Sequence, residues 1–287
     1  MNTQEIFIPI QNYTIQADLY EGFSEQKNVI VMAHGLGGEK KAGLLDFAQF
    51  YAEQGYSVCI FDHRGFGQST GKIKNLVDKN SQIEDWKTVV HYLKNQFQIL
   101  ASNMILWGYS FSGGHVLTLA SKQNYKAIIA NFPHIDGLAS LALYPKKYLI
   151  PATLLSLQDL AYATINRVKT MPVVAQNRFA ILAGEDCFDG YKSIIPQNLH
   201  WENAVPARIV ATIGLYRPIT TAQIIESPTF IVGATNDSLI PIQATRKTAK
   251  KIKNGYYFEE QCGHFDLFHE PFKKRILDQH LKFLGAL

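Results

Sequence analysis

A serine stands in a glycine-rich turn where its hydroxyl could act as a nucleophile. Residues 108–114 read GYSFSGG, follow an apolar run and precede the apolar helical stretch 115–120. A strand, a sharp turn and a helix in this order are typical of a nucleophile elbow, which would present Ser110. The positions two before and two after the serine must be small, and Gly108 and Ser112 both are. Ser112 departs from the usual GxSxG pattern, in which the last position is glycine.

The same turn has two other interpretations, a phosphate-binding loop and a plain tight turn. The GKS or GKT sequence that a phosphate loop requires is absent from this segment. Nucleophilic catalysis needs more than the serine, because a serine hydroxyl reacts poorly at neutral pH. A base must take its proton, and a carboxylate must hold that base in one tautomer.

An aspartate and a histidine follow two later apolar runs and could supply these groups. Asp237 lies in ATNDSLIP, directly after the run 229–233, and His264 lies in QCGHFD, after the run 256–259. Active sites of open parallel sheets lie at the carboxyl ends of the strands, so the two loops would meet at one edge. The chain order Ser110, Asp237, His264 is also the order that this kind of elbow requires.

Simpler alternatives stay open for both residues. Asp237 could cap the helix that follows it, and His264 could be a structural histidine among the nine of the chain. Asp266 is a rival acid, but it is only two residues from His264 and better suits a helix start or the surface. The matching loop positions of Asp237 and His264 favour the catalytic interpretation.

The oxyanion that forms when a serine attacks a carbonyl needs backbone N–H donors. One donor normally comes from the residue after the nucleophile, here Phe111. The second would come from HGLGG at 34–38, where glycines let the backbone approach a substrate closely, and we assign it to Leu36. The alternative is that HGLGG only begins a helix.

A further loop, DHRGFGQS at 62–69, carries Asp62 and Arg64. We expect this pair to be structural, because a charge pair can pin such a loop beside the site. No histidine or cysteine pair shows metal-ligand spacing, and GLGG lacks the placement and the downstream acid of a dinucleotide site. We therefore expect neither a metal nor another cofactor.

The rest of the pattern predicts the framework that would position these residues. Residues 5–10 and 13–20 alternate polar and apolar side chains, which predicts an antiparallel hairpin. Short apolar runs predict buried parallel strands, and apolar residues three and four apart predict helices. The predicted strands are 29–33, 56–61, 104–107, 127–130, 229–233 and 256–259, and the predicted helices are 43–54, 83–97, 243–253 and one that starts at His269. The fold class is therefore α/β, a mostly parallel eight-stranded sheet with helices on both faces.

The alternation of strands and helices stops near Pro133 and resumes only at 229. Between these points, prolines separate short apolar helical segments, and the interval is too long for a plain connection. We predict a helical cap at 133–226, inserted into a core formed by 1–132 and 227–287.

The composition is that of a globular protein. Of the 287 residues, 47% are hydrophobic and 18% are charged, which excludes a disordered or fibrous chain. The net charge of +4 is spread out, and its densest basic stretch, 246–253, fits a solvated helix face better than a nucleic-acid site. The start of the chain lacks a signal-peptide pattern, no apolar run reaches the roughly 18 residues of a membrane span, and the three cysteines show no paired spacing. We expect a soluble cytoplasmic protein; its oligomeric state stays open, with a homodimer as one option.

Five segments together resemble the α/β-hydrolase superfamily and follow its order: HGLGG, DHRGFGQS, GYSFSGG, GATNDSLIP and GHFDLF. Residues 132–140 (FPHIDGLAS) and 216–218 (YRP) further resemble a branch that includes polyketide-transferase-like acyl hydrolases. The resemblance implies a cofactor-free reaction in which Ser110 attacks the carbonyl of a small-molecule acyl substrate and forms an acyl-enzyme. Water or another acceptor would then release the acyl group.

The cap would select the acyl group. Four large side chains in or directly beside the cap could line an apolar pocket, although Trp and Tyr more often pack onto the sheet. These four are Phe132, Leu138, Trp201 and Tyr216.

We predict a serine-dependent acyl hydrolase, a carboxylesterase or thioesterase, for small to medium acyl substrates. One alternative is an acyltransferase that uses the same acyl-enzyme. Another is a binding protein on a hydrolase fold that has lost its activity, against which the intact set of three groups argues. Haloalkane dehalogenation is excluded because it needs a carboxylate where Ser110 stands, and no feature favours a peptidase.

Overall fold

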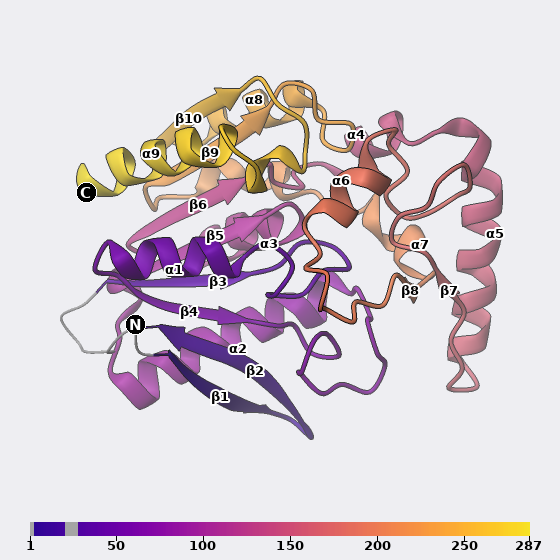
Figure 1. Cartoon of the computed structure of the whole chain (residues 1–287), viewed down its shortest axis with the longest axis horizontal. Coiled ribbons are helices and arrows are strands. Elements are labelled where there is room, and N and C mark those ends of the chain that lie inside the picture. The colour runs from indigo at the N-terminus through magenta and orange to yellow at the C-terminus, as the bar shows by residue number, and fades with distance from the viewer. Residues whose placement is uncertain (1–2, 21–27) are drawn as a thin grey trace.

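A single large sheet organises the chain. The computed structural model describes residues 3–20 and 28–287 (Figure 1). Among these residues, eight strands form one sheet in the order β1-β2-β4-β3-β5-β6-β9-β10. The strands are β1 (Thr3–Ile10), β2 (Tyr13–Tyr20), β3 (Val29–Ala33), β4 (Ser57–Phe61), β5 (Met104–Tyr109), β6 (Ala127–Asn131), β9 (Thr229–Ala234) and β10 (Gly255–Glu260).

The first two strands form the predicted hairpin. β1 and β2 pair antiparallel, with Ile10 opposite Tyr13, and β2 also pairs antiparallel with β4. The other neighbouring pairs in this sheet are parallel. The sheet therefore has the eight strands and the mostly parallel order that the sequence predicts.

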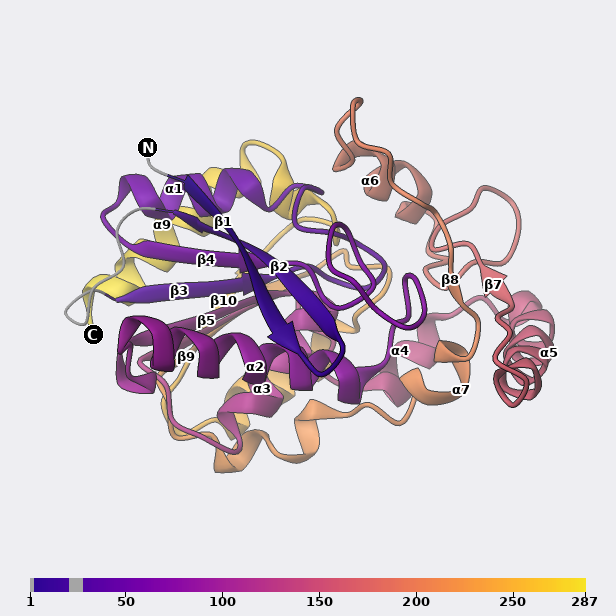
Figure 2. The same ribbon diagram turned by 90° about the horizontal axis from the view of Figure 1, so that it is seen from below.

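Helices cover both faces of the sheet, which explains why β3 to β6 and β9 are buried along their whole length. One hydrophobic cluster joins the sheet to α2, α3 and α8, and a second joins its other face to α1 and α9. In Figure 2, α1 and α9 lie above the strands and α2 and α3 below them. These helices are α1 (Leu45–Glu53), α2 (Lys79–Phe97), α3 (Phe111–Ala120), α8 (Ile242–Lys251) and α9 (Phe272–Gly285).

Local side-chain chemistry explains where the predicted helix boundaries differ. Helix α2 begins four residues before the predicted 83, because the side chain of Asp78 accepts from Ser81 N and caps its first turn. The closing helix begins at Phe272 rather than at His269, because His269 ends the short 3-10 helix η4 (Asp266–Phe268).

Between β6 and β9 the chain leaves the sheet and forms smaller elements. They lie beyond the carboxyl ends of the parallel strands, and α5 stands at the outer edge of the molecule (Figures 1 and 2). Along residues 3–20 and 28–287, no helix is long and apolar enough to cross a membrane. The elements are α4 (Gly137–Leu143), α5 (Lys146–Ala163), β7 (Thr170–Met171), α6 (Cys187–Ser193), β8 (Val205–Pro206), α7 (Ile209–Ile213), η2 (Pro218–Thr220) and η3 (Ala222–Ile224).

A buried carboxylate ties α5 to its neighbours. Asp159 accepts from the backbone N–H of Lys169 at 2.6 Å and of Arg208 at 2.9 Å. The Arg208 guanidinium also binds it through Nε, at 2.7 Å, and through a terminal nitrogen, at 2.9 Å. The inner face of α5 is thereby fixed, while its outer face is left to solvent.

Candidate active site

Ser110 occupies a sharp turn between β5 and α3. Its φ of +54° and ψ of −116° lie in a region that residues with side chains rarely adopt. Backbone hydrogen bonds hold it there, since Ser110 N donates to Asn131 O at 2.9 Å and His134 N donates to Ser110 O at 2.8 Å. Strain of this kind persists only where the surrounding structure fixes it, and it clusters at functional sites.

The departure from GxSxG at Ser112 has a steric explanation. A Cβ on Gly108 would lie 2.3 Å from Ser112 O, and a Cβ on Gly113 would lie 2.7 Å from Pro133 Cβ. The close approaches that require glycine therefore occur at 108 and 113, and position 112 has room for a side chain. Its hydroxyl donates to His34 O at 2.6 Å.

The structure brings Ser110, His264 and Asp237 together. His264 Nε2 lies 2.9 Å from Ser110 Oγ, and His264 Nδ1 lies 2.7 Å from Asp237 Oδ2. Because a carboxylate only accepts, Nδ1 carries the ring proton of the neutral imidazole and donates it to Asp237. Nε2 is then free to accept the proton of the Ser110 hydroxyl.

Asp237 contacts His264 and does not cap helix α8, which has Pro241 at its N-cap position and no side-chain cap. Its Oδ1 accepts from the backbone N–H of Leu239 and of Ile240, each at 2.8 Å, and its Oδ2 faces His264. The side chains of His264 and Asp237 are only 1% and 2% exposed, so little water competes for their hydrogen bond. The rival Asp266 instead accepts from Gly263 N at 2.7 Å and begins η4.

Leu36 and Phe111 flank Ser110, where the predicted oxyanion donors are needed. Both line the same cavity as Ser110, and Phe111 is the first residue of α3, where helix N–H groups have no partner within the helix. The early loop 34–38 packs tightly onto the turn, because a Cβ on Gly35 would lie 3.0 Å from Ser110 Cβ. The positive end of the α3 dipole points toward the same place.

Three side chains hold the carbonyl groups of the loop 34–38. Ser112 donates to His34 O, as described above, from the turn that carries Ser110. Tyr191 OH donates to Leu36 O at 3.0 Å, and Trp201 Nε1 donates to Gly37 O at 2.9 Å. The rings of Tyr191 and Trp201 stack with centroids 4.8 Å apart. A loop whose carbonyls are fixed also has fixed N–H directions, which is what an oxyanion site requires.

A buried polar network lies behind this loop. His63 Nδ1 lies 3.2 Å from Asp85 Oδ2, His63 Nε2 lies 3.3 Å from Ser112 Oγ, and Arg64 N donates to Asp85 Oδ2 at 3.1 Å. The prediction that Asp62 and Arg64 form a charge pair is wrong. Arg64 binds Asp85 and Glu84 on α2, whereas Asp62 accepts from Lys40 N at 2.6 Å. The fold places Arg64 next to two acids of α2 and not next to the acid in its own loop. The positions of these acids in the sequence do not indicate this pairing.

Burial affects both histidines of this network. It lowers the pKa of His34 to about 4 and the pKa of His63 well below its ordinary value. Burial also raises the pKa of Asp85, which the neighbouring Arg64 opposes. In the part of the chain that the structure describes, no three His, Cys, Asp or Glu side chains gather as a metal site, and the cysteines at 59, 187 and 262 are free and buried.

An apolar cavity opens onto Ser110. A second, smaller hollow lies against His264, and Leu36, Ser110 and Leu182 border both. The larger cavity is lined mainly by aliphatic side chains of the segment between β6 and β9, among them Leu141, Leu143, Leu149, Ala152, Ile181, Leu182, Val210 and Ile213. Ser110 therefore stands between a large apolar space and a smaller one.

The four residues predicted to line an acyl pocket do not border the larger cavity. Phe132 is 1% exposed and packs in the core against the sheet. Tyr216 is buried, with its hydroxyl 2.9 Å from both His115 Nδ1 and Thr118 Oγ1. Trp201 binds the loop 34–38, and Leu138 is half exposed on α4. Trp201 and Tyr216 each form hydrogen bonds through a polar side-chain atom, and these bonds place them away from the cavity. Smaller aliphatic side chains line the cavity instead.

Comparison with known proteins identifies relatives across most of the chain. A family model described as the alpha/beta hydrolase fold matches residues 28–271. The quorum-quenching protein AidA of Acinetobacter baumannii is 32% identical over 255 residues, which are 88% of this chain and 84% of that protein. A monoacylglycerol lipase of Mycolicibacterium smegmatis is 26% identical over 285 residues, 96% of this chain and 94% of the lipase.

A third relative links the chain to polyketide transferases. The polyketide transferase GrgF of Penicillium sp. is 29% identical over 132 residues, 46% of this chain and 45% of that protein. The crystal structure of the α/β hydrolase GrgF superposes with a TM-score of 0.83 at 20% identity, covering 100% of this chain and 99% of that one. The shared fold and the resemblance to this branch agree with the sequence motifs.

Proposed function

This chain belongs to the α/β-hydrolase fold family, and from that premise we propose that it is a serine-dependent acyl hydrolase acting on ester or thioester bonds. The observation that carries the proposal is the 2.9 Å contact between His264 Nε2 and Ser110 Oγ, with Asp237 on the other ring nitrogen. The same three groups in the same spatial arrangement perform acyl transfer on several unrelated folds, although their order along the chain differs between folds. The lipase among the relatives also acts on acyl esters, as its name states.

The proposed reaction begins when Ser110 Oγ attacks the acyl carbonyl and His264 Nε2 takes its proton. Asp237 stabilises the resulting imidazolium and keeps the ring in position. The carbonyl oxygen becomes an oxyanion that the N–H groups of Leu36 and Phe111 would receive. His264 then protonates the leaving alcohol or thiol, which leaves an acyl-enzyme. Water, deprotonated by His264, releases the acid and restores Ser110.

The two hollows suggest where the two parts of the substrate bind. The larger, aliphatic cavity would hold the acyl chain, and the smaller one beside His264 would hold the leaving group that His264 protonates. The wall of the larger cavity is mostly aliphatic, which suits a hydrocarbon chain. We therefore propose a small to medium apolar acyl group as the substrate class.

We also propose that the segment 133–226 acts as a cap that selects this acyl group. Most of the side chains around the larger cavity belong to it, and two of its residues, Tyr191 and Trp201, bind the loop 34–38. Selection and positioning would therefore come from one segment.

The proposal is tested by labelling with a serine-reactive fluorophosphonate, followed by a panel of esters, thioesters and lactones of increasing acyl length. We expect Ser110→Ala to abolish labelling and to lower kcat/KM by on the order of 10⁴-fold or more. Ser121→Ala, at the other end of α3, is the matched control and should label like the wild type. Undiminished turnover in Ser110→Ala would reject the nucleophile.

The similarity to a polyketide transferase favours one second candidate, in which the acyl-enzyme passes its acyl group to an alcohol or amine. The acyl-enzyme step is identical, so only its partitioning differs. Adding an alcohol acceptor separates the two: a transferase gives mainly the new ester at millimolar acceptor, whereas a hydrolase gives mainly the acid.

A further inference from the structure

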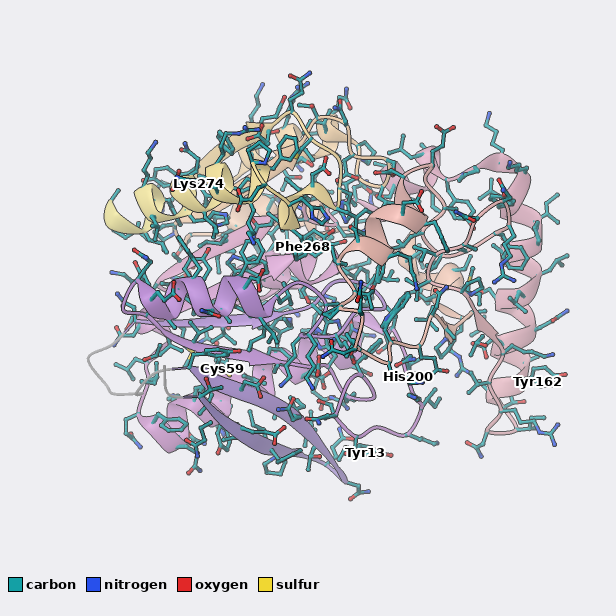
Figure 3. The ribbon with its side chains drawn as sticks, viewed as in Figure 1. Tyr13, Cys59, Tyr162, His200, Phe268 and Lys274 are labelled. Carbon is teal, nitrogen blue, oxygen red and sulfur yellow. The ribbon has the colours of Figure 1, made fainter. Side chains whose placement is uncertain are left out.

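The outer face of α5 carries a row of exposed aliphatic side chains. Ile150, Leu154 and Leu157 are 73%, 55% and 56% exposed. Their spacing of four and three places them on one face of the helix, and we call them the α5 stripe. Ala152, Ser156 and Asp159 occupy the opposite, buried face. In Figures 1 and 2 the helix stands at the edge of the molecule, and the side chains along it in Figure 3 project to both sides.

This exposed surface is continuous with the larger cavity. Leu143 and Leu149, just before and at the start of α5, are 44% and 37% exposed and also line the cavity that reaches Ser110. Contiguous apolar surface of this kind on a folded protein marks an interaction site. Whatever covers the stripe would lie beside the mouth of the cavity.

Positive charge flanks the stripe at both ends. Lys146 and Lys147 begin α5, and Arg167 and Lys169 follow its end, and all four are exposed. The charged residues from 137 to 182 comprise five cations and a single acid. That acid is Asp159, which is buried against Arg208 and leaves the surface positive.

The charges exclude a second copy of this face as the favoured occupant. Two α5 helices packed side by side, parallel or antiparallel, would bring cationic ends against cationic ends, because both ends of each helix are basic. The occupant must instead be apolar and carry negative charge. An exposed aliphatic helix face with flanking lysines and arginines matches the surface of an anionic bilayer, which presents both apolar chains and negative charge.

We propose that the α5 stripe docks this protein on an anionic lipid surface. The aliphatic side chains enter the boundary between headgroups and acyl chains, and the four cations contact lipid phosphates. Leu143 and Leu149 then face the lipid at the mouth of the cavity, so an amphiphilic acyl ester could move from the bilayer toward Ser110. The docking stands on α5 alone, and only this substrate route rests on the proposed function.

The test measures co-sedimentation with vesicles, using the inactive Ser110→Ala protein so that no turnover contributes. We expect binding to phosphatidylcholine vesicles containing phosphatidylglycerol and weak binding to phosphatidylcholine alone. Changing the three stripe residues to serine should weaken binding on the order of tenfold or more. Lys146→Gln with Lys147→Gln should weaken binding to the anionic vesicles roughly tenfold, and added salt should do the same.

A matched control removes equally exposed apolar side chains elsewhere. Phe7→Ser, Leu100→Ser and Ile224→Ser change residues that are 54%, 56% and 57% exposed and should leave vesicle binding intact. The stripe variant, with Ser110 present, should hydrolyse a water-soluble short ester like the wild type and lose activity only on vesicle-borne ester.

Three outcomes would overturn the docking proposal. One is absence of binding to anionic vesicles, which would leave an acidic protein as the occupant. Another is equal loss in the control and stripe variants. The last is a dimer in solution that the stripe substitutions dissociate, which would make the face an interface between copies. Failure of the wild type on every ester, with vesicle binding intact, would reject the proposed function and not the docking.

Discussion

Ser112 and His34 are 78 residues apart in the sequence, and the Ser112 hydroxyl donates to the His34 carbonyl at 2.6 Å. This bond joins the turn that carries Ser110 to the loop that carries Leu36. His63 contacts the same hydroxyl from the side of α2. The residue that departs from the usual motif thus connects the two backbone segments from which the proposed oxyanion donors come.

Ser112→Ala should lower kcat about tenfold and leave KM almost unchanged. The loop 34–38 would lose the donor that fixes the His34 carbonyl, and that carbonyl would stay buried without a partner, at a cost of about 1–3 kcal/mol. Because the proposed oxyanion donor of Leu36 would act mainly on the transition state, the loss should appear in kcat. Steady-state kinetics on a soluble ester measures the split. A rise in KM with unchanged kcat would contradict the positioning role.

Tyr191→Phe should also lower kcat about tenfold, because it removes the donor to the Leu36 carbonyl but keeps the ring stacked on Trp201. Tyr51→Phe is the control, since it removes another buried tyrosine hydroxyl, one that contacts His280 far from the loop. Both variants should lose about 1 kcal/mol of stability in denaturant unfolding. Only Tyr191→Phe should lose turnover; equal losses in both would leave Tyr191 with a purely structural role.

Asp237→Asn should lower kcat on the order of 10⁴-fold, because an amide can stabilise the wrong tautomer of His264 and cannot stabilise its cation. Asp266→Asn is the matched change in the neighbouring acid and should retain activity within a few-fold. Pre-steady-state labelling of Ser110 by a fluorophosphonate, compared between the two variants, gives the ratio directly. The reverse order of effects would transfer the acid role to Asp266.

Stability should fall steeply as the pH drops from about 6.5 toward 4. Burial lowers the pKa of several histidines, so that unfolded histidines take up protons near pH 6.5 whereas the folded ones do not. The unfolded state then binds more protons, and each such histidine contributes about 1.4 kcal/mol per pH unit in this window. These residues are His34, His63, His115, His134 and His280.

The buried acids Asp62 and Asp85 act in the opposite sense, because burial raises their pKa, but they are fewer. Denaturant unfolding between roughly pH 7.5 and pH 5 measures how the free energy of unfolding changes with pH. Most other carboxylates titrate at lower pH than this range. His280→Gln provides the internal check. It should be less stable at neutral pH, since His280 bonds Tyr51 and Asn131, and its slope should be shallower by about one proton. A pH-independent stability would contradict the assignment.

Local patterns were sufficient for the sheet and for the three residues at its edge. β3, β5 and β9 are short apolar runs that are buried on both faces. Such runs lack the regularly spaced polar residues of an amphipathic helix, so the two patterns can be told apart in the sequence. Ser110, Asp237 and His264 follow strand ends, so topology alone places them at one edge. Their chemical roles are part of the proposed function.

The contacts that hold the site were not visible in the sequence. Tyr191 binds a carbonyl 155 residues away, and Trp201 one 164 residues away. Every residue carries a backbone carbonyl, so the sequence does not indicate which carbonyl a donating side chain will bind. The predicted pocket role of Trp201 and Tyr216 fails for a related reason: Trp201 donates to a distant backbone carbonyl, and the Tyr216 hydroxyl contacts the side chains of His115 and Thr118.

Tyr191 and Trp201 have a consequence for attempts to redesign what the enzyme accepts. Both residues belong to the segment 133–226, which also supplies most of the cavity wall. Exchanging this segment for one from a relative would change the substrate preference and would also remove two hydrogen bonds to the loop beside Ser110. Such a chimera would have a lower turnover rate even where the substrate fits its cavity. Donors grafted back at these two positions would restore the rate and let preference be tuned independently.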